Sequence, residues 1–115
     1  MKYSVIVTSR FKKEAEIAKK RGLSMSELED VIDKLILDKP LEPKYKDHAL
    51  KGIYTGCREC HINSDWLLIY KKDKQKLLLI LRRTGTHSDL FWNTKKFLRS
   101  EFWNEYCNIG KDEEN

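Results

Sequence analysis

The hydrophobic pattern at the start of the chain predicts a strand followed by a helix. Residues 2–8, KYSVIVT, are rich in β-branched side chains, which is typical of a strand. Ser9 then stands where a helix N-cap is expected. The apolar residues that follow share one helical face: Phe11, Ala15 and Ala18. We expect this helix to run to about Arg21 and to stop at Gly22.

A second helix is predicted by a longer apolar stripe. Ser24 and Ser26 each stand three residues before a glutamate, which is the spacing of a capping box. The residues behind them that recur at helical spacing are Leu28, Val31, Ile32, Leu35 and Ile36. The helix must end before Pro40, because a proline disfavours the helical conformation in the residue that precedes it. The following segment, 39–47, contains both prolines and predicts an extended connection.

After residue 50 the pattern changes to that of strands. It predicts strands at 57–62, 66–70 and 77–81, separated by polar turns at 63–64 and 71–76. The run at 77–81 is continuously apolar, as expected for a central strand that is buried on both faces. The order β-α-α-β-β-β predicts an α+β domain in which two helices pack on one face of an antiparallel sheet.

The last quarter of the chain returns to helical spacing. Residues 84–87 predict a loop, and Ser88 or Asp89 could cap the helix that follows. The apolar residues of 90–107 that fall roughly in line are Phe91, Leu98, Phe102 and Tyr106. We expect one domain over residues 1–91 and a helical extension over 92–115 that ends in a frayed acidic tail.

Composition indicates a small basic domain. The 115 residues leave room for one core, and 23 lysines and arginines outnumber 18 acidic residues. A basic surface suits a polyanionic partner, of which nucleic acid is the commonest, although ordinary solubility charge explains it almost as well. The sequence has neither the apolar segment of a signal peptide nor a stretch that could span a membrane. We therefore expect a cytoplasmic protein with reduced thiols.

The run CRECH at 57–61 matches three kinds of site at once. C-x-x-C-H is the spacing of c-type haem attachment, and C-x-x-C alone fits a redox dithiol or half a zinc site. Haem attachment of the c type needs export, for which the chain shows no signal. On a strand, Cys57 and Cys60 should point to opposite faces, whereas Glu59 and His61 share the face of Cys57. We therefore predict neither a metal nor a cofactor at this motif.

The three histidines stand beside other reactive groups. Those neighbours are Asp47 beside His48, the set Glu59, Asp65 and Trp66 around His61, and Arg83 before His87. Such groups suit RNA cleavage, in which a ribose 2′-oxygen loses a proton, the phosphorane charge is neutralised and the 5′-oxygen gains a proton. Trp66 and Phe91 could stack on the bases of a splayed strand, with core packing as the alternative for both.

Three motifs in order add a resemblance to a known family. They are KDHALKG at 46–52, GCRECHINSDWLLIY at 56–70 and RTGTHSDLF at 83–91. The chain resembles the YafQ branch of the RelE-superfamily toxins, which are bacterial mRNA endonucleases of type II toxin–antitoxin systems. The resemblance is strongest over 46–91, and the order of elements extends it to residue 1. It implies a RelE-like fold and a toxin that enters the ribosomal A site and cuts mRNA by 2′-oxygen attack, without a metal.

The resemblance also implies a set of site residues. They are His48, His61, Asp65, Arg83, His87 and Phe91, with Glu59 where the family has an acidic residue. Chemistry and resemblance together assign His87 as the general acid and Arg83 as the cation that neutralises the phosphorane. His61 or His48 is the expected base, with Asp65 fixing a tautomer. Phe91 and Trp66 are expected to hold the RNA base.

The implied partners are a small cognate antitoxin, the ribosome and mRNA, with operator DNA bound only through the toxin–antitoxin complex and no membrane. Two features depart from the family. Its motif does not include the cysteines, and its chains usually end just after the position of Phe91. We expect the extension to pack on the domain, with a contact to ribosome or antitoxin through Lys95, Lys96 and Arg99 as the alternative.

Three other functions remain open at this level. The first is a gyrase-directed relative of the same fold, although such relatives lack the histidine, aspartate and arginine set. The second is a nucleic-acid-binding module without catalysis. The third is a metalloenzyme that uses a cysteine and histidine cluster: Cys57, Cys60, His61 and Cys107.

Overall fold

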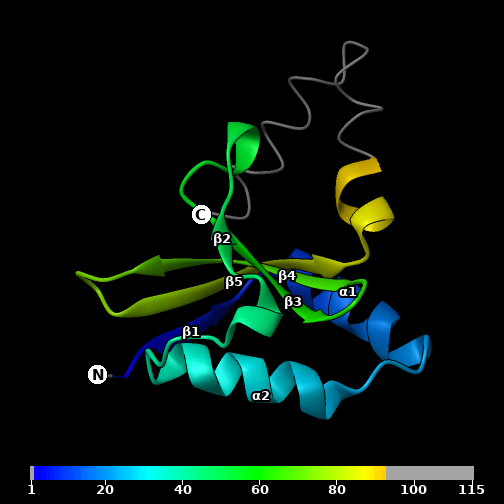
Figure 1. Cartoon of the computed structure of the whole chain (residues 1–115), viewed down its shortest axis with the longest axis horizontal. Coiled ribbons are helices and arrows are strands. Elements are labelled where there is room, and N and C mark those ends of the chain that lie inside the picture. The colour runs from blue at the N-terminus through cyan, green and yellow to red at the C-terminus, as the bar shows by residue number, and fades with distance from the viewer. Residues whose placement is uncertain (1, 93–115) are drawn as a thin grey trace.

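The computed structural model describes residues 2–92, and residue 1 and residues 93–115 lie outside the described part. The strands are β1 (Ser4–Val7), β2 (His48–Ala49), β3 (Arg58–Asn63), β4 (Trp66–Asp73) and β5 (Leu78–Gly85). The helices are α1 (Ser9–Lys20) and α2 (Met25–Ile36), with short turns η1 (Pro43–Tyr45), η2 (Gly52–Tyr54) and η3 (Ser88–Trp92). In Figure 1 the long helix α2 runs beneath the sheet, and β2 rises on its other side. In residues 2–92, no helix combines the length and the apolar character needed to cross a membrane.

Both predicted helices are confirmed, with one change at the start of α1. Thr8 rather than Ser9 is the N-cap, and its hydroxyl accepts a hydrogen bond from the backbone N–H of Phe11 at 3.0 Å. The same hydroxyl lies 3.0 Å from the carbonyl oxygen of Leu81, so the cap also ties the helix start to β5. Gly22 ends this segment with φ +84°, a left-handed conformation that favours glycine. Ser24, one of the two predicted candidates, caps α2.

The five strands form one sheet in the order β1-β5-β4-β3-β2. The α+β class is confirmed, but the sheet is mixed rather than antiparallel, because β1 pairs with β5 in parallel from Ser4 and Leu78 to Val7 and Leu81. The other pairings are antiparallel. Apolar periodicity shows which residues share a face but carries no information on strand direction, which explains the difference. The sequence also did not predict the two-residue strand β2 or the turn η1 within 39–47.

Apolar side chains pack on both faces of the sheet. On the helix side, the strand residues Cys60, Ile62, Trp66, Leu68, Tyr70, Leu79 and Leu81 meet the helix residues Phe11, Ala18, Leu28, Val31 and Leu35. On the other face, a smaller cluster consists of Tyr54, Cys57, Leu67, Ile69 and Leu90. Cys57 and Cys60 therefore lie on opposite faces, as predicted, and each is buried. Burial raises the pKa of the Cys60 thiol, which makes it inert as a ligand or a nucleophile.

Strand β5 is longer and less evenly buried than its apolar run suggests. Leu79 and Leu81 are fully buried on the helix side, whereas Leu78 and Ile80 are only half-buried. The strand continues to Gly85, and its register with β4 shifts between Ile69 and Tyr70. This extension beyond the predicted end brings Arg83 into the sheet and leads directly to His87.

Candidate active site

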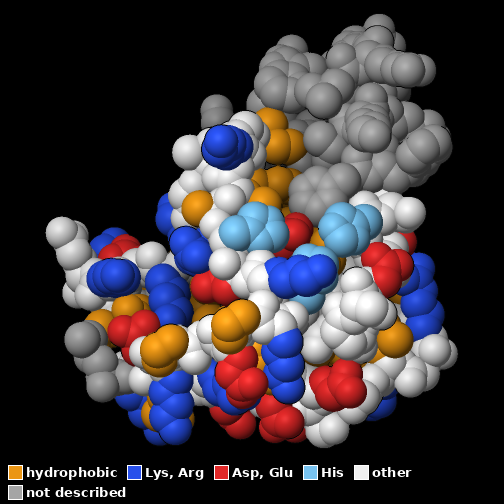
Figure 2. All heavy atoms as spheres, in the orientation of Figure 1, with side chains coloured by type: hydrophobic (Ala, Val, Ile, Leu, Met, Phe, Trp, Pro, Cys, Tyr) orange, Lys and Arg blue, Asp and Glu red, His pale blue; other side chains and the backbone are white. Residues whose placement is uncertain are grey.

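Strand register places most of the expected site residues in two rows on the sheet face opposite the helices. His48 pairs with Glu59, Glu59 with Ile69, and Ile69 with Arg83 across four strands. The next row consists of His61, Leu67 and Gly85, two residues before His87. Residues directly opposite each other project from the same face of a sheet. Figure 2 shows the histidine side chains gathered on one surface of the molecule.

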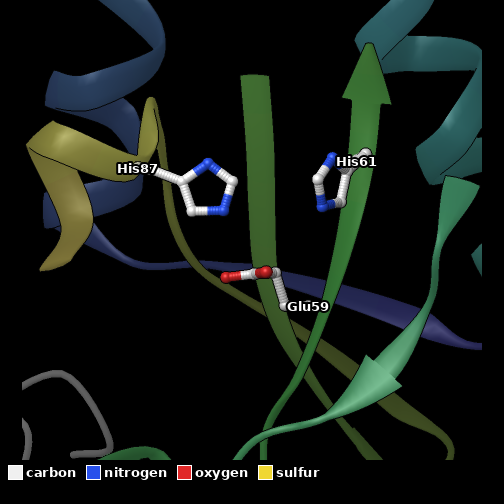
Figure 3. A group of neighbouring side chains, drawn as sticks. All are labelled: Glu59, His61 and His87. Carbon is white, nitrogen blue, oxygen red and sulfur yellow. The ribbon is translucent and has the colours of Figure 1, made fainter. Parts of the chain in front are cut away.

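Glu59, His61 and His87 form the centre of this surface. One nitrogen of each imidazole and one carboxylate oxygen all lie within 4.8 Å of one another. The two imidazole rings are 5.6 Å apart between centroids and inclined at 61°. Figure 3 shows them on either side of the Glu59 carboxylate, with Glu59 and His61 both on β3 and His87 after the end of β5. Two imidazoles that face each other across a carboxylate can give and accept protons on the two sides of one bound group.

The loop that carries His87 is held by two aspartates. Asp65 Oδ1 lies 3.3 Å from His87 Nδ1 and accepts a hydrogen bond from the His87 backbone N–H at 3.4 Å. Asp89 accepts from the backbone N–H of Thr86 at 3.0 Å and from Arg21 Nη1 at 2.7 Å. The Arg21 guanidinium holds the pKa of the Asp89 carboxyl below its usual range. Asp65 was expected to orient the base, but in the structure it orients the expected acid, His87.

His48 lies at the outer end of the first row. Its Nδ1 is 2.6 Å from the carbonyl oxygen of Lys46, and its Nε2 is 3.5 Å from Glu59 Oε1. Because the carbonyl can only accept, it holds the proton on Nδ1, and Nε2 carries a proton only in the charged ring. The preceding residue, Asp47, accepts from the Tyr70 hydroxyl at 2.6 Å and from Arg58 Nη2 at 3.2 Å. These contacts fix the segment that places His48, and the sequence did not predict them.

Glu59 is a buried acid, with 3% of its surface exposed. Burial raises the pKa of its carboxyl, and the nearby His48, His87 and His61 oppose this effect. A carboxyl with a higher pKa in the folded state contributes stability that is fully present below its unfolded pKa, about 4.3. This contribution is lost as the pH rises through the folded pKa.

We therefore expect Glu59→Gln to gain stability relative to the unchanged protein as the pH rises from about 4 towards neutrality. Urea unfolding of both proteins near pH 4.5 and near pH 7.5 measures the change. Glu29→Gln, which alters an exposed acid on α2, serves as the control and should show the same difference at both pH values. A Glu59→Gln difference that is also independent of pH would contradict the expectation.

Arg83 lies in the first row, as expected of a site residue, but its guanidinium is held by partners that the sequence did not predict. Only 3% of it is exposed, and its guanidinium donates to both carboxylate oxygens of Glu14, with the shortest distance 2.6 Å from Nη2. Its Nη1 also donates to the Tyr54 hydroxyl at 3.0 Å. Direct contact with a phosphorane would require Arg83 to leave this ion pair. Glu14 comes from α1, 69 residues earlier in the chain, and no sequence signal identified it.

The two aromatic residues differ from the histidines in their placement. Trp66 is 1% exposed, and its indole N–H donates to Thr84 Oγ1 at 2.8 Å. This indole cannot stack on a base without leaving the core. Trp66 is therefore a core residue, which was the alternative to base stacking. Phe91 belongs to η3, and its side chain lies outside the described residues, as do the predicted extension and Cys107.

Only one group of side chains in residues 2–92 has the composition and spacing to hold a metal ion: Glu59, His61 and His87. The cysteine site considered from the sequence does not form, because the sulfurs of Cys57 and Cys60 belong to clusters on opposite faces of the sheet.

Comparisons with known proteins agree on one family. Residues 3–92 match the family model described as bacterial toxin of type II toxin–antitoxin system, YafQ. The mRNA interferase toxin YafQ of Escherichia coli strain K12 is 40% identical over 85 residues, which cover 73% of this chain and 90% of that protein. The crystal structure of the E. coli DinJ–YafQ toxin–antitoxin complex contains a chain with 37% identity and a TM-score of 0.72, covering 79% of this chain and 99% of that one. A metal-bound toxin from Helicobacter pylori has 42% identity and a TM-score of 0.73, with 79% and 100% covered.

Proposed function

This chain belongs to the YafQ family of bacterial toxins of type II toxin–antitoxin systems, and we propose that it cuts mRNA on the ribosome by attack of a ribose 2′-oxygen. The observation that carries the proposal is the convergence of Glu59, His61 and His87 on one sheet face. The similar E. coli protein is an mRNA interferase, which supports RNA as the substrate. A non-catalytic binding toxin of the same fold would not need two imidazoles set across a carboxylate.

The proposed reaction divides the proton transfers between the two histidines. His61 takes the proton of the 2′-hydroxyl, and the 2′-oxygen forms a bond to phosphorus. The bond from phosphorus to the 5′-oxygen breaks, and protonated His87 gives its proton to that oxygen. The products are a 2′,3′-cyclic phosphate and a 5′-hydroxyl, so no metal-bound water is required. His48, whose Nε2 lies 3.5 Å from Glu59 Oε1, remains the alternative base.

The charges around the two histidines support this division. Asp65 Oδ1 lies 3.3 Å from His87 Nδ1, where its negative charge can pair with the imidazolium that an acid must be before it acts. The imidazolium also supplies positive charge where the phosphorane forms. Arg83 is held by Glu14 and Tyr54. It can therefore contact the phosphorane, as expected from the sequence, only after its guanidinium is released from Glu14.

A groove beside His61 offers a path for the neighbouring nucleotides. It has a volume of about 520 Å³. Its lining residues are Glu27, Asp30, Lys44, Tyr45, Lys46, His61, Ile62, Asn63 and Ser64. Lys44 and Lys46 are exposed there and can pair with phosphates that flank the cut.

Replacing Lys44 and Lys46 together by alanine should lower kcat/KM for mRNA cleavage about threefold to tenfold, because two exposed charge pairs are lost. Cleavage kinetics at two salt concentrations measure the loss, which should shrink at higher salt. Lys12→Ala with Lys13→Ala, a pair of exposed lysines on α1, is the matched control. Equal losses in both double variants would contradict a role for the groove.

The function is tested in a purified translation system. Toxin is added to ribosomes that translate a defined mRNA, and the new RNA ends are mapped. We expect cuts at codons only while ribosomes are present, with cyclic or 3′-phosphate and 5′-hydroxyl ends. Cuts with 3′-hydroxyl and 5′-phosphate ends would indicate attack by water and refute the mechanism. No cutting at all would favour a non-catalytic toxin of the same fold.

We also propose that a small cognate antitoxin neutralises this chain in a hetero-oligomer. The E. coli relative of known structure is bound to its antitoxin, DinJ, and its toxin chain aligns with this one over 99% of its length. Co-expression with the reading frame next to this gene should restore growth and yield a complex that co-purifies.

A further inference from the structure

The groove beside His61 contains acidic side chains that a channel for phosphates alone would not need. It has a volume of about 520 Å³, and its lining includes Glu27 and Asp30 of α2. Both residues are exposed, and their spacing along the helix places them on the same helical face. This acidic side of the groove repels the phosphates of an RNA chain. The part of a nucleotide that suits it is therefore the base.

Asn63, at the end of β3, holds the Glu27 carboxylate in place. Asn63 Nδ2 donates a hydrogen bond to Glu27 Oε2 at 3.2 Å, which joins the strand end to the helix. This bond engages Oε2, so Glu27 Oε1 is left for a ligand. Because the amide nitrogen of Asn63 points at the carboxylate, the amide oxygen is directed elsewhere and is also an acceptor. The acidic side of the groove therefore offers mainly hydrogen-bond acceptors.

A surface of acceptors distinguishes the four RNA bases by their Watson–Crick edges. Guanine presents two neighbouring donors on this edge, the N1–H and the N2 amino group, and one carboxylate can accept from both. Adenine and cytosine present a single amino group beside a ring nitrogen that is itself an acceptor. Uracil presents one N–H between two carbonyl oxygens. In these three bases an acceptor would face a carboxylate oxygen, which is repulsive, so guanine is the base that fits.

The position of His61 determines which nucleotide enters the groove. His61 also lines the groove, and in the proposed reaction it takes the proton of the attacking 2′-hydroxyl. That hydroxyl belongs to the nucleotide on the 5′ side of the cut bond. Lys44 and Lys46 line the same groove and can pair with the phosphates of this part of the RNA. The base that reaches Glu27 is therefore the one on the 5′ side.

We propose that Glu27, held by Asn63, selects guanine at the nucleotide on the 5′ side of the cut bond. This selection rests on the proposed function, because it places His61 at the attacking 2′-hydroxyl. The expected preference for guanine over adenine is about tenfold. This is at the low end for a base contact made by two hydrogen bonds, because Glu27 is exposed to solvent.

Cleavage of mRNAs that differ in one base of the A-site codon tests the selection. The full-length toxin should cut about tenfold faster after guanine than after adenine, and Glu27→Gln should reduce this ratio to less than about threefold. Glu29→Gln removes the same charge from the same helix outside the groove, and it should keep the original ratio. Because both rates come from one preparation, the ratio does not depend on how much of a variant is folded. The absence of a guanine preference, or an unchanged preference in Glu27→Gln, would overturn the proposal.

Nucleotide binding tests the groove without cleavage. NMR titrations of the full-length toxin with guanosine 3′-monophosphate and with adenosine 3′-monophosphate measure the two dissociation constants. Guanosine 3′-monophosphate should bind at least about threefold more tightly, and this difference should disappear in Glu27→Gln but not in Glu29→Gln. Equal binding of the two nucleotides would refute the selection of guanine. If the toxin cuts no mRNA in any condition but still prefers the guanine nucleotide, the nuclease function fails while the guanine site stands.

Discussion

Replacing His87 by glutamine should lower the rate of mRNA cleavage on the ribosome by roughly 10²- to 10⁴-fold, the usual contribution of a general acid. Glutamine keeps polar atoms at the position but cannot deliver a proton to the 5′-oxygen. His87 is 55% exposed at its side chain, and its imidazole lies near the exposed carboxylate of Asp65 and the ring of His61. The free energy of unfolding should therefore change by no more than about 0.5 kcal/mol. Large loss of activity with a preserved fold distinguishes chemistry from structure.

Single-turnover cleavage of one codon, with toxin in excess over stalled ribosomes, measures this loss without product release. Ser88→Ala changes the exposed neighbour of His87 and should cut at the normal rate. Asp65→Asn should give an intermediate loss, because it removes the charge that holds His87 in position but leaves the imidazole. A His87→Gln protein that cuts as fast as Ser88→Ala would show that another group protonates the leaving oxygen.

Local patterns in the sequence were sufficient to predict the two helices and the side chains that share each face of β3. Helical spacing and caps predicted α1 and α2 to within a residue or two, because both depend on neighbours close in sequence. Alternation along 57–62 separated Cys57 from Cys60 and placed Glu59 with His61, since side chains on a strand alternate whatever the strand pairs with. The C-x-x-C-H pattern therefore suggests a haem, redox or zinc site only if its strand conformation is ignored.

The remaining features depend on contacts between distant parts of the chain. The parallel pairing of β1 with β5 joins residues more than 70 positions apart, and nothing in either strand encodes its direction. The prediction that His87 belongs to the site came from the family resemblance and not from periodicity, because residues in a loop have no regular spacing that assigns them to a face. The partner of Asp65 was uncertain for the same reason: the turn after β3 lies near both His61 and the loop of His87, and only the structure shows that it contacts His87.

Arg83 shows most clearly what the sequence could not reveal. An arginine in a motif beside a histidine is expected to meet phosphate. In the structure it closes an ion pair with a helix residue 69 positions earlier, at the part of β5 that extends beyond β1. Glu14 also accepts from the backbone N–H of Thr84 at 3.3 Å, an edge group that β1 is too short to reach. One carboxylate therefore satisfies both the buried guanidinium and the open strand edge.

Replacing Glu14 by alanine should therefore reduce the free energy of unfolding by about 3–5 kcal/mol, since it leaves a buried guanidinium without its counter-charge. The ion pair is 3% exposed at Arg83 and 15% at Glu14, so solvent can compensate little of the loss. For a domain of this size the melting temperature should fall by roughly 12 °C or more. Urea unfolding at neutral pH measures the change. Glu16→Ala, at an exposed position of the same helix, should cost no more than about 0.5 kcal/mol.

A double variant separates the lost charge from the lost packing. If the cost of Glu14→Ala arises from the uncompensated Arg83, adding Arg83→Met should recover part of the stability, because an apolar side chain of similar length needs no partner. Two independent losses that simply add would instead mean that Glu14 and Arg83 stabilise the fold through separate contacts.

The same variants also test the role of Arg83 in the mechanism. If Arg83 acts mainly by holding β5 in place, the recovered double variant should cut mRNA faster than Arg83→Met alone at a temperature where both are folded. If the double variant and Arg83→Met are equally slow, the result would instead indicate that Arg83 contacts the phosphorane directly, after its release from Glu14.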